Sequence, residues 1–393
     1  WGWLLAAMMA NLVWAMPQFS LGTAALQQNL FPHYLASDSA KVICVLCLFL
    51  IATAVVWFYD SPGWGVRVFE LSLKAMVGLV VLSFFGVVVA MSWKGELDWI
   101  SIAKGFVPDL SLLWRPVTGL HGFIDESSAR DYWTTTILHA QRERMIAAAA
   151  TAVGINMTFL LPYSMLRKGW DRAFRGLAAF DLSTGLFIPF LVATSCVVIA
   201  AASQFHAQFD ERIISQPAAD TAGSYRDNLE KRVRAESGSE DRSVLSESEM
   251  NAKIDALPSA DRKLAYMLIK RDSLDLATAL ENLFGKGGLT QKVFGIGVLG
   301  MAISTIVILM VINGFCVTEM TGRDSDRVVQ RLGALFPGVV GGLGFLALWG
   351  ADQARFWLAV PTSNFGMVLL PIAYIAFFFM MNSPSLLGDA MPR

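Results

Sequence analysis

The hydrophobic positions of the chain gather into long, nearly uninterrupted runs separated by shorter polar stretches. Eight runs reach the length of about 20 residues that a helix needs to cross the hydrocarbon core of a bilayer. Lipid offers no partner to backbone amides, so such runs must form helices, and none shows the strict alternation of a membrane β-strand. The predicted spans run approximately over Trp1–Leu30, Val42–Tyr59, Val68–Trp93, Met145–Leu166, Leu182–Phe205, Val293–Val317, Leu332–Gly350 and Trp357–Met381.

Composition supports a polytopic, all-α membrane protein. Of the 393 residues, 55% are hydrophobic and only 16% are charged, whereas a soluble domain carries about a quarter charged residues. The net charge of −1 argues against a nucleic-acid partner, which requires a concentrated basic face. The sequence has no phosphate-binding glycine loop, no HExxH motif and no Cys/His zinc spacing, so we do not expect an enzyme.

The cysteines and the chain ends add two expectations. The four cysteines lie in or at the ends of apolar runs and are predicted to act as small hydrophobes rather than as a disulfide framework; they are Cys44, Cys47, Cys196 and Cys316. Trp1 opens directly onto an apolar run without a charged segment before it, which does not fit a signal peptide. We expect a piece of a longer protein, incomplete at both ends.

Basic residues in the short loops predict the orientation. The loops 166–181 and 318–331 are rich in Arg and Lys, and the positive-inside rule assigns them, with both chain ends, to the cytoplasm. The 94–144 loop and the 206–290 loop are then extracytoplasmic, in a multi-pass protein of a bacterial-type inner or plasma membrane. The predicted organisation is five spans in 1–205, the charged loop, and three spans in 291–393.

The 206–290 loop differs in composition from the rest of the chain, with 15 acidic and 12 basic residues. Around Ser237–Ser248 its content of Ser, Glu and Arg predicts disorder. Over Ser259–Phe284, apolar residues at helical spacing predict amphipathic helices with Ser259 as an N-cap. The plain interpretation is a solvated insertion between two spans, and the functional alternative is a lid or a docking surface for a partner.

The fourth span contains the strongest candidate for chemistry. It reads ATAVGINMTFLLPYSML, with Gly and Asn in mid-span and Pro162 later, and such breaks survive in lipid where they line a cavity or bind an ion. An unwound helix here would offer oxygen donors and one thioether, a set suited to a divalent cation. The candidate ligands are the carbonyls of Val153 and Gly154 and the side chains of Asn156, Met157 and Thr158. The alternative is an ordinary helix that uses Gly for close packing, Asn for an interhelical bond and Pro for a kink.

The last and first spans carry further neutral polar residues. A Pro-Thr-Ser-Asn cluster opens the last span, and Asn364 could turn its amide to the same cavity, although Thr and Ser at a helix start often act only as caps. The first span carries Asn11, Gln18 and Gln28. No carboxylate or histidine lies near the middle of a predicted span, whereas proton relays through a bilayer use Asp, Glu or His.

The stretch GINMTFLLPYS resembles the sixth helix of Nramp-type divalent metal transporters, where a Met-Pro-His-Asn-x-x-x-His-Ser run sits at an unwound segment. Aligning the final Ser with Ser164 places Asn156 at the metal-binding methionine, Thr158 and Tyr163 at the two histidines, and Val153 at the carbonyl ligand. A shift of one residue would give those roles to Met157 and Gly154 instead.

Other segments extend the resemblance over nearly the whole chain, as helices three to ten of an eleven-helix fold. The first span is similar to the family's third helix, and the last span resembles its tenth, with Asn364 where a glutamine often faces the metal. The resemblance implies a leucine-transporter-type (APC) inverted-repeat fold, alternating access, and a divalent metal as transported substrate with no cofactor.

Two departures from the family qualify this expectation. The helix with the Asp-Pro-Gly-Asn motif, which supplies the main carboxylate ligand, is absent from the chain, and neutral residues replace the family's acidic and histidine positions. The chain is more similar to the Nramp-related magnesium transporters, which implies Mg²⁺ or Mn²⁺, or else Fe²⁺, moved without a proton. The alternatives are an amino acid transporter of the same fold and a non-transporting sensor or scaffold that works through the 206–290 loop.

Overall fold

The computed structural model describes most of the chain. It covers residues 2–35, 37–58, 64–107, 109–152, 165, 169–170, 172–205, 219–237, 246–269, 288–323, 326–348, 362, 368–369, 371–372, 374–380 and 382–387. Within these ranges the regular structure is helical, and there is no strand. The chain forms two compact units. We call Trp1–Val87, Ala147–Val197 and Leu280–Arg393 the membrane unit, and Val88–Ile146 with Val198–Ala279 the loop unit.

Five helical stretches are long and apolar enough to cross a membrane, namely Gly2–Leu30, Ser39–Phe58, Arg175–Ala200, Gln291–Thr321 and Arg327–Ala347. They agree with five of the eight predicted spans. The third predicted span falls on α3 (Trp64–Trp93), whose section Val81–Trp93 is a shorter apolar helix. The fourth and the last predicted spans lie largely outside the described residues. The described part therefore has the character of a membrane protein with several crossings.

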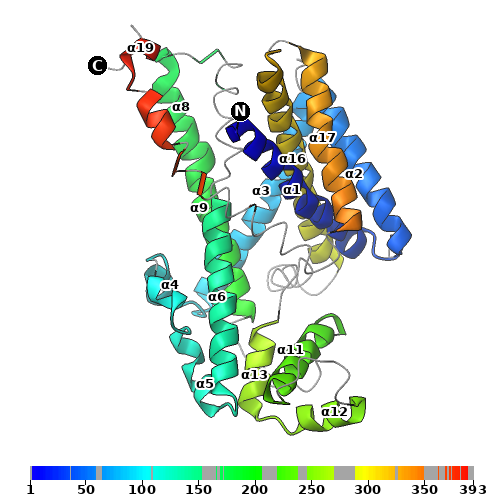
Figure 1. Cartoon of the computed structure of the whole chain (residues 1–393), viewed down its shortest axis with the longest axis vertical. Helices are drawn as coiled ribbons and strands as arrows, with labels where there is room; N and C mark the ends of the chain where they lie inside the picture. Colours follow the sequence, from blue (N-terminus) through cyan, green and yellow to red (C-terminus); the bar gives the residue numbers. More distant parts are fainter. Residues whose placement is uncertain are drawn as a thin grey trace. The chain divides into compact units, whose positions relative to one another are not determined.

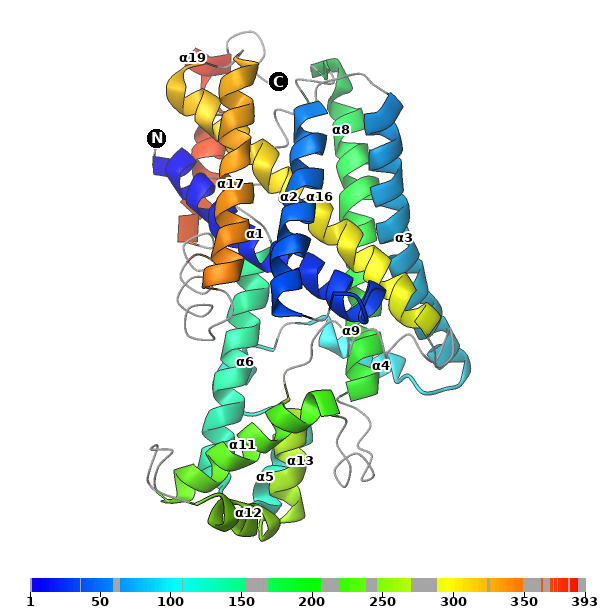
Figure 2. The same ribbon diagram turned by 90° about the vertical axis from the view of Figure 1, so that its right-hand side faces the viewer.

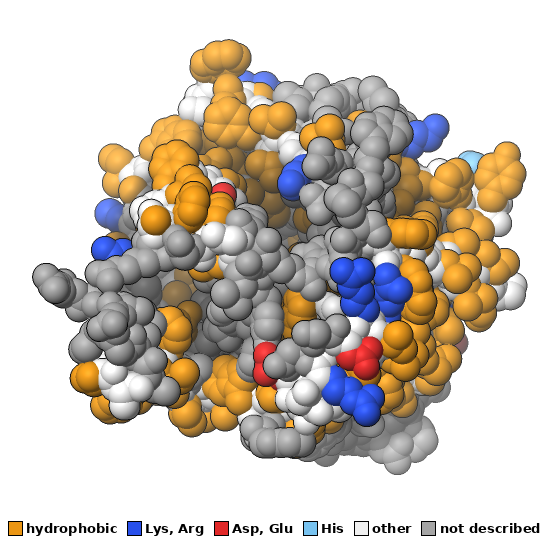
Figure 3. Space-filling model, turned by 90° about the horizontal axis from the view of Figure 1, so that it is seen from above, with side chains coloured by type: hydrophobic (Ala, Val, Ile, Leu, Met, Phe, Trp, Pro, Cys, Tyr) orange, Lys and Arg blue, Asp and Glu red, His pale blue; other side chains and the backbone are white. Residues whose placement is uncertain are grey.

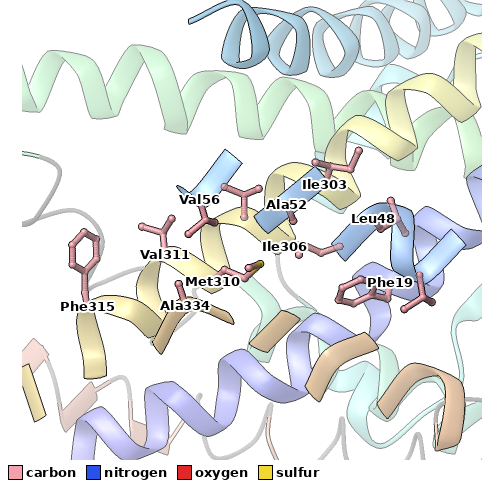
Figure 4. Packing of buried hydrophobic residues seen from close by; sticks show 12 residues of the cluster. Phe19, Leu48, Ala52, Val56, Ile303, Ile306, Met310, Val311, Phe315 and Ala334 are labelled. Carbon is pink, nitrogen blue, oxygen red and sulfur yellow. The ribbon is translucent and has the colours of Figure 1, made fainter. Parts of the chain in front are cut away.

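Four helices form the core of the membrane unit. α1 (Gly2–Ala24) and its π-helical end η1 (Ala25–Leu30) pack with α2 (Asp38–Phe58), α16 (Gly288–Thr321) and α17 (Arg327–Ala347) (Figures 1 and 2). Figure 4 shows the buried cluster between them, to which Phe19 of α1, Leu48 of α2 and Met310 of α16 belong. Because lipid is as apolar as these side chains, their fit rather than water exclusion holds the helices together.

Glycines of α17 let its backbone approach the neighbouring helices. A methyl group at Gly341 would overlap Ala15 of α1, and one at Gly338 would lie 2.8 Å from the Phe49 ring of α2. A methyl group at Gly333 would lie 2.7 Å from the Cβ of Val317 in α16. Small residues at these crossings are the usual means by which membrane helices pack closely.

Apolar side chains also cover the outside of the spans. Leu46 and Leu50 of α2, Phe190 of α9 (Ile188–Phe205) and Leu343 of α17 are exposed. Figure 3 shows hydrophobic side chains over much of one described face, together with several Lys and Arg side chains and some Asp and Glu side chains. Such a surface would be unfavourable in water and is the ordinary surface of a protein in contact with lipid tails.

The end of α2 lies beside the beginning of α17. The Arg331 guanidinium lies 5.0 Å from the centroid of the Trp57 ring, and its Nη2 donates to the Trp57 carbonyl at 3.0 Å. The predicted topology requires these two helix ends to share one side of the membrane. Trp and Arg are also typical residues of the membrane–water interface.

The loop unit has a separate hydrophobic core. It is built by α5 (His121–Glu126), α6 (Arg130–Ala152), α11 (Ala219–Ser237), α12 (Glu247–Asp255) and α13 (Ser259–Met267) (Figure 2). Trp133 and Ile137 of the first predicted loop pack with Leu229 and Leu264 of the second. The predicted topology places both loops on one side of the membrane, with two predicted spans between them.

A buried ion pair within the second loop is hydrogen-bonded to residues of the first. Asp261 is fully buried and accepts hydrogen bonds from Arg232 Nε at 2.9 Å, Trp133 Nε1 at 2.8 Å and Ser127 Oγ at 3.1 Å. Arg232, which is 1% exposed, also donates to Ser128 Oγ at 2.8 Å and pairs with Glu236 at 3.0 Å. A buried charge is tolerated only where it is paired and hydrogen-bonded in this way.

The helix starts of the charged loop differ from the sequence expectation. Ser259 was expected to cap α13, but the N-cap residue is Pro258, without a side-chain hydrogen bond, because Ser259 already belongs to the first helical turn. Ser246 instead opens α12 with a capping box, in which its side chain and that of Glu249 bond each other's backbone N–H. Residues 246–248, expected to be disordered, are therefore the start of a helix, whereas 238–245 lie outside the described residues.

Seven shorter helical segments complete the described structure. The α-helices are α4 (Trp99–Gly105), α8 (Arg175–Leu182) and α19 (Pro384–Leu387). The 3-10 helices are η2 (Leu110–Leu113), η3 (Thr118–Leu120) and η4 (Arg172–Phe174), and η5 (Ser183–Phe187) is a π-helix.

Alkaline pH is expected to destabilise the loop unit. Burial raises the pKa of Tyr225, and likewise that of Tyr132, above the ordinary value. A raised pKa in the folded state means that the stabilisation is complete below about pH 10, the unfolded value, and is lost as the pH rises through the folded value. Circular dichroism of the protein in detergent micelles should show a melting temperature that falls above about pH 10. Y225F should reduce this fall, and an equal fall in Y225F would contradict the assignment.

Candidate functional site

The predicted metal ligands lie next to described helices but are not among the described residues. Val153, Gly154, Asn156, Met157, Thr158 and Asn364 all fall in the gaps. α6 is described as far as Ala152, one residue before this set, and Thr362 is a helical residue two positions before Asn364. Their arrangement stays a prediction. The buried polar side chains that the structure does describe in the membrane unit belong to the other helices.

Buried polar residues of the described membrane unit are all neutral. They are Asn11, Thr23, Asn29, Ser83, Asn313 and Thr318. The buried charged residues of the described chain, Arg232 and Asp261, belong to the loop unit. An amide or hydroxyl in the interior of a membrane protein costs far less than a charge, and it can still offer an oxygen to a cation or to water.

Asn29 is the most unusual of these residues. It is 2% exposed, it lies in the π-helical segment η1, and neither its Oδ1 nor its Nδ2 has a hydrogen-bond partner among the described residues. Gly295 of α16 packs directly on it, because a methyl group there would lie 2.6 Å from the Asn29 Cβ. π-helical turns break the regular ladder of backbone bonds and are frequent at functional sites.

Asn313 lies in the last third of α16, the longest of the described helices. Its Nδ2 donates to the carbonyl of Gly333 in α17 at 2.8 Å, while its Oδ1 is buried without a partner among the described residues. The donated bond links two spans in the manner of an interhelical polar contact. The remaining oxygen is one more neutral donor in the interior of the unit.

A second π-helical segment interrupts the span that begins at α8. η5 (Ser183–Phe187) separates α8 from α9, and hydroxyl groups follow the break. Ser183 Oγ donates to the Ala179 carbonyl at 2.8 Å, and Thr184 Oγ1 donates to the Phe180 carbonyl at 2.7 Å. These hydroxyls donate hydrogen bonds to backbone carbonyls at the point where the α-helical pattern of backbone hydrogen bonds changes, as Ser and Thr commonly do in membrane helices.

The described residues form no candidate metal site built from charged or thiol side chains. They contain no group of three or more His, Cys, Asp or Glu side chains that could hold a metal ion. The four cysteines are free, as the sequence predicts, with Cys44, Cys196 and Cys316 buried and Cys47 exposed. The buried polar side chains of the described membrane unit are thus neutral oxygen donors rather than imidazoles or carboxylates.

Thr23, Asn29 and Asn313 were not among the candidates derived from the sequence. Asn313 could have been found by the rule applied to the fourth span, because it is an amide within a long apolar run. Asn29 carried no such signal, since its place at the end of a predicted span is typical of an exposed residue. Its neighbour Gln28 is indeed exposed.

Comparison with protein-family models, with curated proteins and with solved structures finds no match for this chain. The resemblance to the Nramp family therefore remains a prediction that rests on the motifs described above.

Proposed function

We propose that the chain is a secondary transporter that moves a divalent metal cation, Mg²⁺ or Mn²⁺ in the first place, across the membrane by alternating access. The observation that carries the proposal is the set of neutral amide and hydroxyl side chains buried within helices long enough to cross a membrane. Oxygen donors are the ligands that these hard cations take. The predicted break at 153–158 would supply the substrate site itself.

The proposed transport does not move protons. Coupling to protons requires a group in the membrane whose protonation changes, usually Asp, Glu or His. In the described membrane unit the buried polar side chains are Asn, Thr and Ser, which keep one protonation state. The cation would then move down its own gradient as a uniporter.

The central test is metal flux into liposomes that contain the protein, followed with a fluorescent indicator for Mg²⁺ or Mn²⁺ inside. N156A should lower the initial rate at least about tenfold, because losing one oxygen donor to a charged group costs about 1.5–3 kcal/mol and 1.4 kcal/mol equals a factor of ten. The matched control is N251A, which removes an exposed amide of α12 that bonds Arg226 at 2.9 Å, and it should transport like the parent chain.

Two outcomes would contradict the proposal. Absence of flux for Mg²⁺, Mn²⁺, Fe²⁺ and Zn²⁺ with the full-length protein would exclude metal transport. Acidification of the liposome lumen in a fixed ratio to metal uptake would leave transport standing but refute the uniport mechanism. A pH indicator inside the same liposomes distinguishes these results in one experiment.

A sensor or scaffold function is the second candidate, and the folded loop unit favours it. The core of that unit includes residues from both outer loops, so deletion of 206–290 would also unfold 94–144 and is not a clean test. Disrupting the unit from within by R232A is sharper. Metal flux that survives this change supports the transporter, whereas a protein without flux that binds a partner only when Arg232 is present supports the scaffold.

A further inference from the structure

The segment that follows α3 exposes a series of large apolar side chains. Within residues 93–107 and 109–117, six of them are between 51% and 70% exposed: Trp99, Ile100, Phe106, Val107, Leu110 and Trp114. Trp93, the last residue of α3, is 88% exposed. Single exposed apolar residues are common, but a continuous series of this size marks an interaction surface.

The beginning of this segment is held at the end of α3. Gly95, with a φ of 71°, lets the chain reverse, and its N–H bonds the Ser92 carbonyl at 3.1 Å. The Trp99 indole then donates to Ser92 Oγ at 3.2 Å. Asp98 caps α4 by accepting from the N–H groups of Ile100 and Ser101. Through the bond of Trp99 to Ser92, the first residue of α4 contacts the apolar helix Val81–Trp93.

The other end of the segment is held by α6. Gln141 Nε2 donates to the carbonyls of Leu112 and Arg115 at 2.8 and 3.0 Å, and its Oε1 accepts from the Val117 N–H at 2.9 Å. Arg142 Nε donates to the Leu113 carbonyl at 2.7 Å. Gln141 precedes Met145, the start of the fourth predicted span, by about one helical turn.

Both anchoring points are therefore next to predicted membrane spans. Ser92 lies one residue before the end of α3, on which the third predicted span falls, and Gln141–Arg142 precede the fourth predicted span. The charges between them balance, with Lys94, Lys104 and Arg115 against Glu96, Asp98 and Asp109. Tryptophan next to a membrane span prefers the boundary between headgroups and acyl chains, because its apolar ring can lie in the acyl region while its N–H stays hydrated.

We propose that residues 93–117 form an interfacial belt that inserts its exposed apolar side chains into the headgroup–acyl boundary of the same membrane. The occupant of this surface is phospholipid rather than a protein. Because the segment has no net charge, insertion depends on apolar burial and not on anionic lipid or low salt. The proposal stands apart from the transported substrate, since it concerns only how the loop unit contacts the bilayer.

The test places an environment-sensitive fluorophore at single cysteines in the full chain, reconstituted in phosphatidylcholine liposomes. C47S first removes the one native thiol that is exposed, and then I100C or V107C carries the probe. A252C on α12, also exposed, is the matched control in the same unit. Two quenchers are compared: iodide in the water, and a lipid with a nitroxide near the top of its acyl chain, at the depth of about 5–10 Å that interfacial segments reach.

The belt predicts iodide quenching severalfold weaker at positions 100 and 107 than at 252, and strong nitroxide quenching only at 100 and 107. Raising the salt concentration to 1 M should leave both results unchanged. Equal iodide quenching at all three positions would overturn the proposal. Shielding from iodide without nitroxide quenching would also overturn it, because a second copy or another protein would then cover the surface.

A measurement on the unmodified chain keeps the proposal testable if a labelled variant fails to fold. Lipid with a photoreactive group at the same acyl depth should crosslink to peptides that contain residues 99–114 and not to peptides from α12. Crosslinks absent from 99–114, with the membrane spans labelled normally, would contradict the belt.

Discussion

Replacement of Asp261 by alanine is expected to unfold the loop unit. The change leaves the Arg232 guanidinium, only 1% exposed, without the carboxylate that it bonds at 2.9 Å, and it removes the acceptor of the Trp133 indole. Removing one partner of a buried ion pair costs about 3–5 kcal/mol. The pair that Arg232 keeps with Glu236 at 3.0 Å offsets only part of this loss, because the Glu236 side chain is largely exposed. For a small helical unit this is a large part of the total stability.

Hydrogen–deuterium exchange of the full chain measures this effect locally. Amides of α11 and α13 should lose protection by roughly a thousandfold in D261A, since 1.4 kcal/mol equals a factor of ten. The matched control is D227A, which removes an exposed carboxylate paired with Lys231 at 2.6 Å and should cost less than about 1 kcal/mol. Equal protection in D261A and D227A would show that the buried pair does not stabilise the unit.

A double variant separates the ion pair from the packing around it. In D261A/R232M the uncompensated charge is gone, so the loss should be smaller than the sum of the two single losses. An additive result would mean that the two residues stabilise the unit independently and not as a pair.

Any side chain larger than hydrogen at Gly341 is expected to separate α17 from α1. The methyl group of G341A would overlap the Ala15 methyl and lie 3.2 Å from the Ala15 carbonyl carbon, which belongs to the backbone and cannot rotate away. Overpacking of this kind costs about 1–3 kcal/mol. In an open helical position the same change would stabilise by about 1 kcal/mol, because Ala favours the helix.

Thermal unfolding in detergent micelles tests this prediction. G341A should lower the melting temperature, whereas G78A should not, because a methyl group at Gly78 of α3 would meet nothing within 4 Å. The exchange variant A15G/G341A moves one methyl group across the interface and should recover most of the loss, since it conserves volume. A stabilising effect of G341A alone would contradict the close approach of the two helices.

The membrane helices were the part of the fold best predicted from the sequence. The requirement for about 20 apolar residues is so strong that Val293–Val317 and Val42–Tyr59 were located within a few residues of α16 and α2. The ends extend further in the structure, because a helix continues past the apolar core into the interfacial region. The breaks η1 and η5 had no sequence signal, since their residues are ordinary for a helix.

The shared core of the two outer loops could not be predicted. Ser127 and Asp261 are 134 residues apart in the chain, and an amphipathic pattern shows that a helix has a partner without showing which partner. The apolar series in the charged loop correctly indicated the helix at Leu264. That it packs on Trp133 of another loop depends on the tertiary fold.

α6 contributes residues to both units of the chain. It is one helix over Arg130–Ala152 and carries Trp133 in the loop-unit core, and its described residues stop one position before the candidate ligand Val153. Trp133 lies about 18 Å along the axis from Met145, where the fourth predicted span begins. Within one continuous helix this separation is fixed, so probes at Trp133 and at Met145 would report the orientation of the same axis.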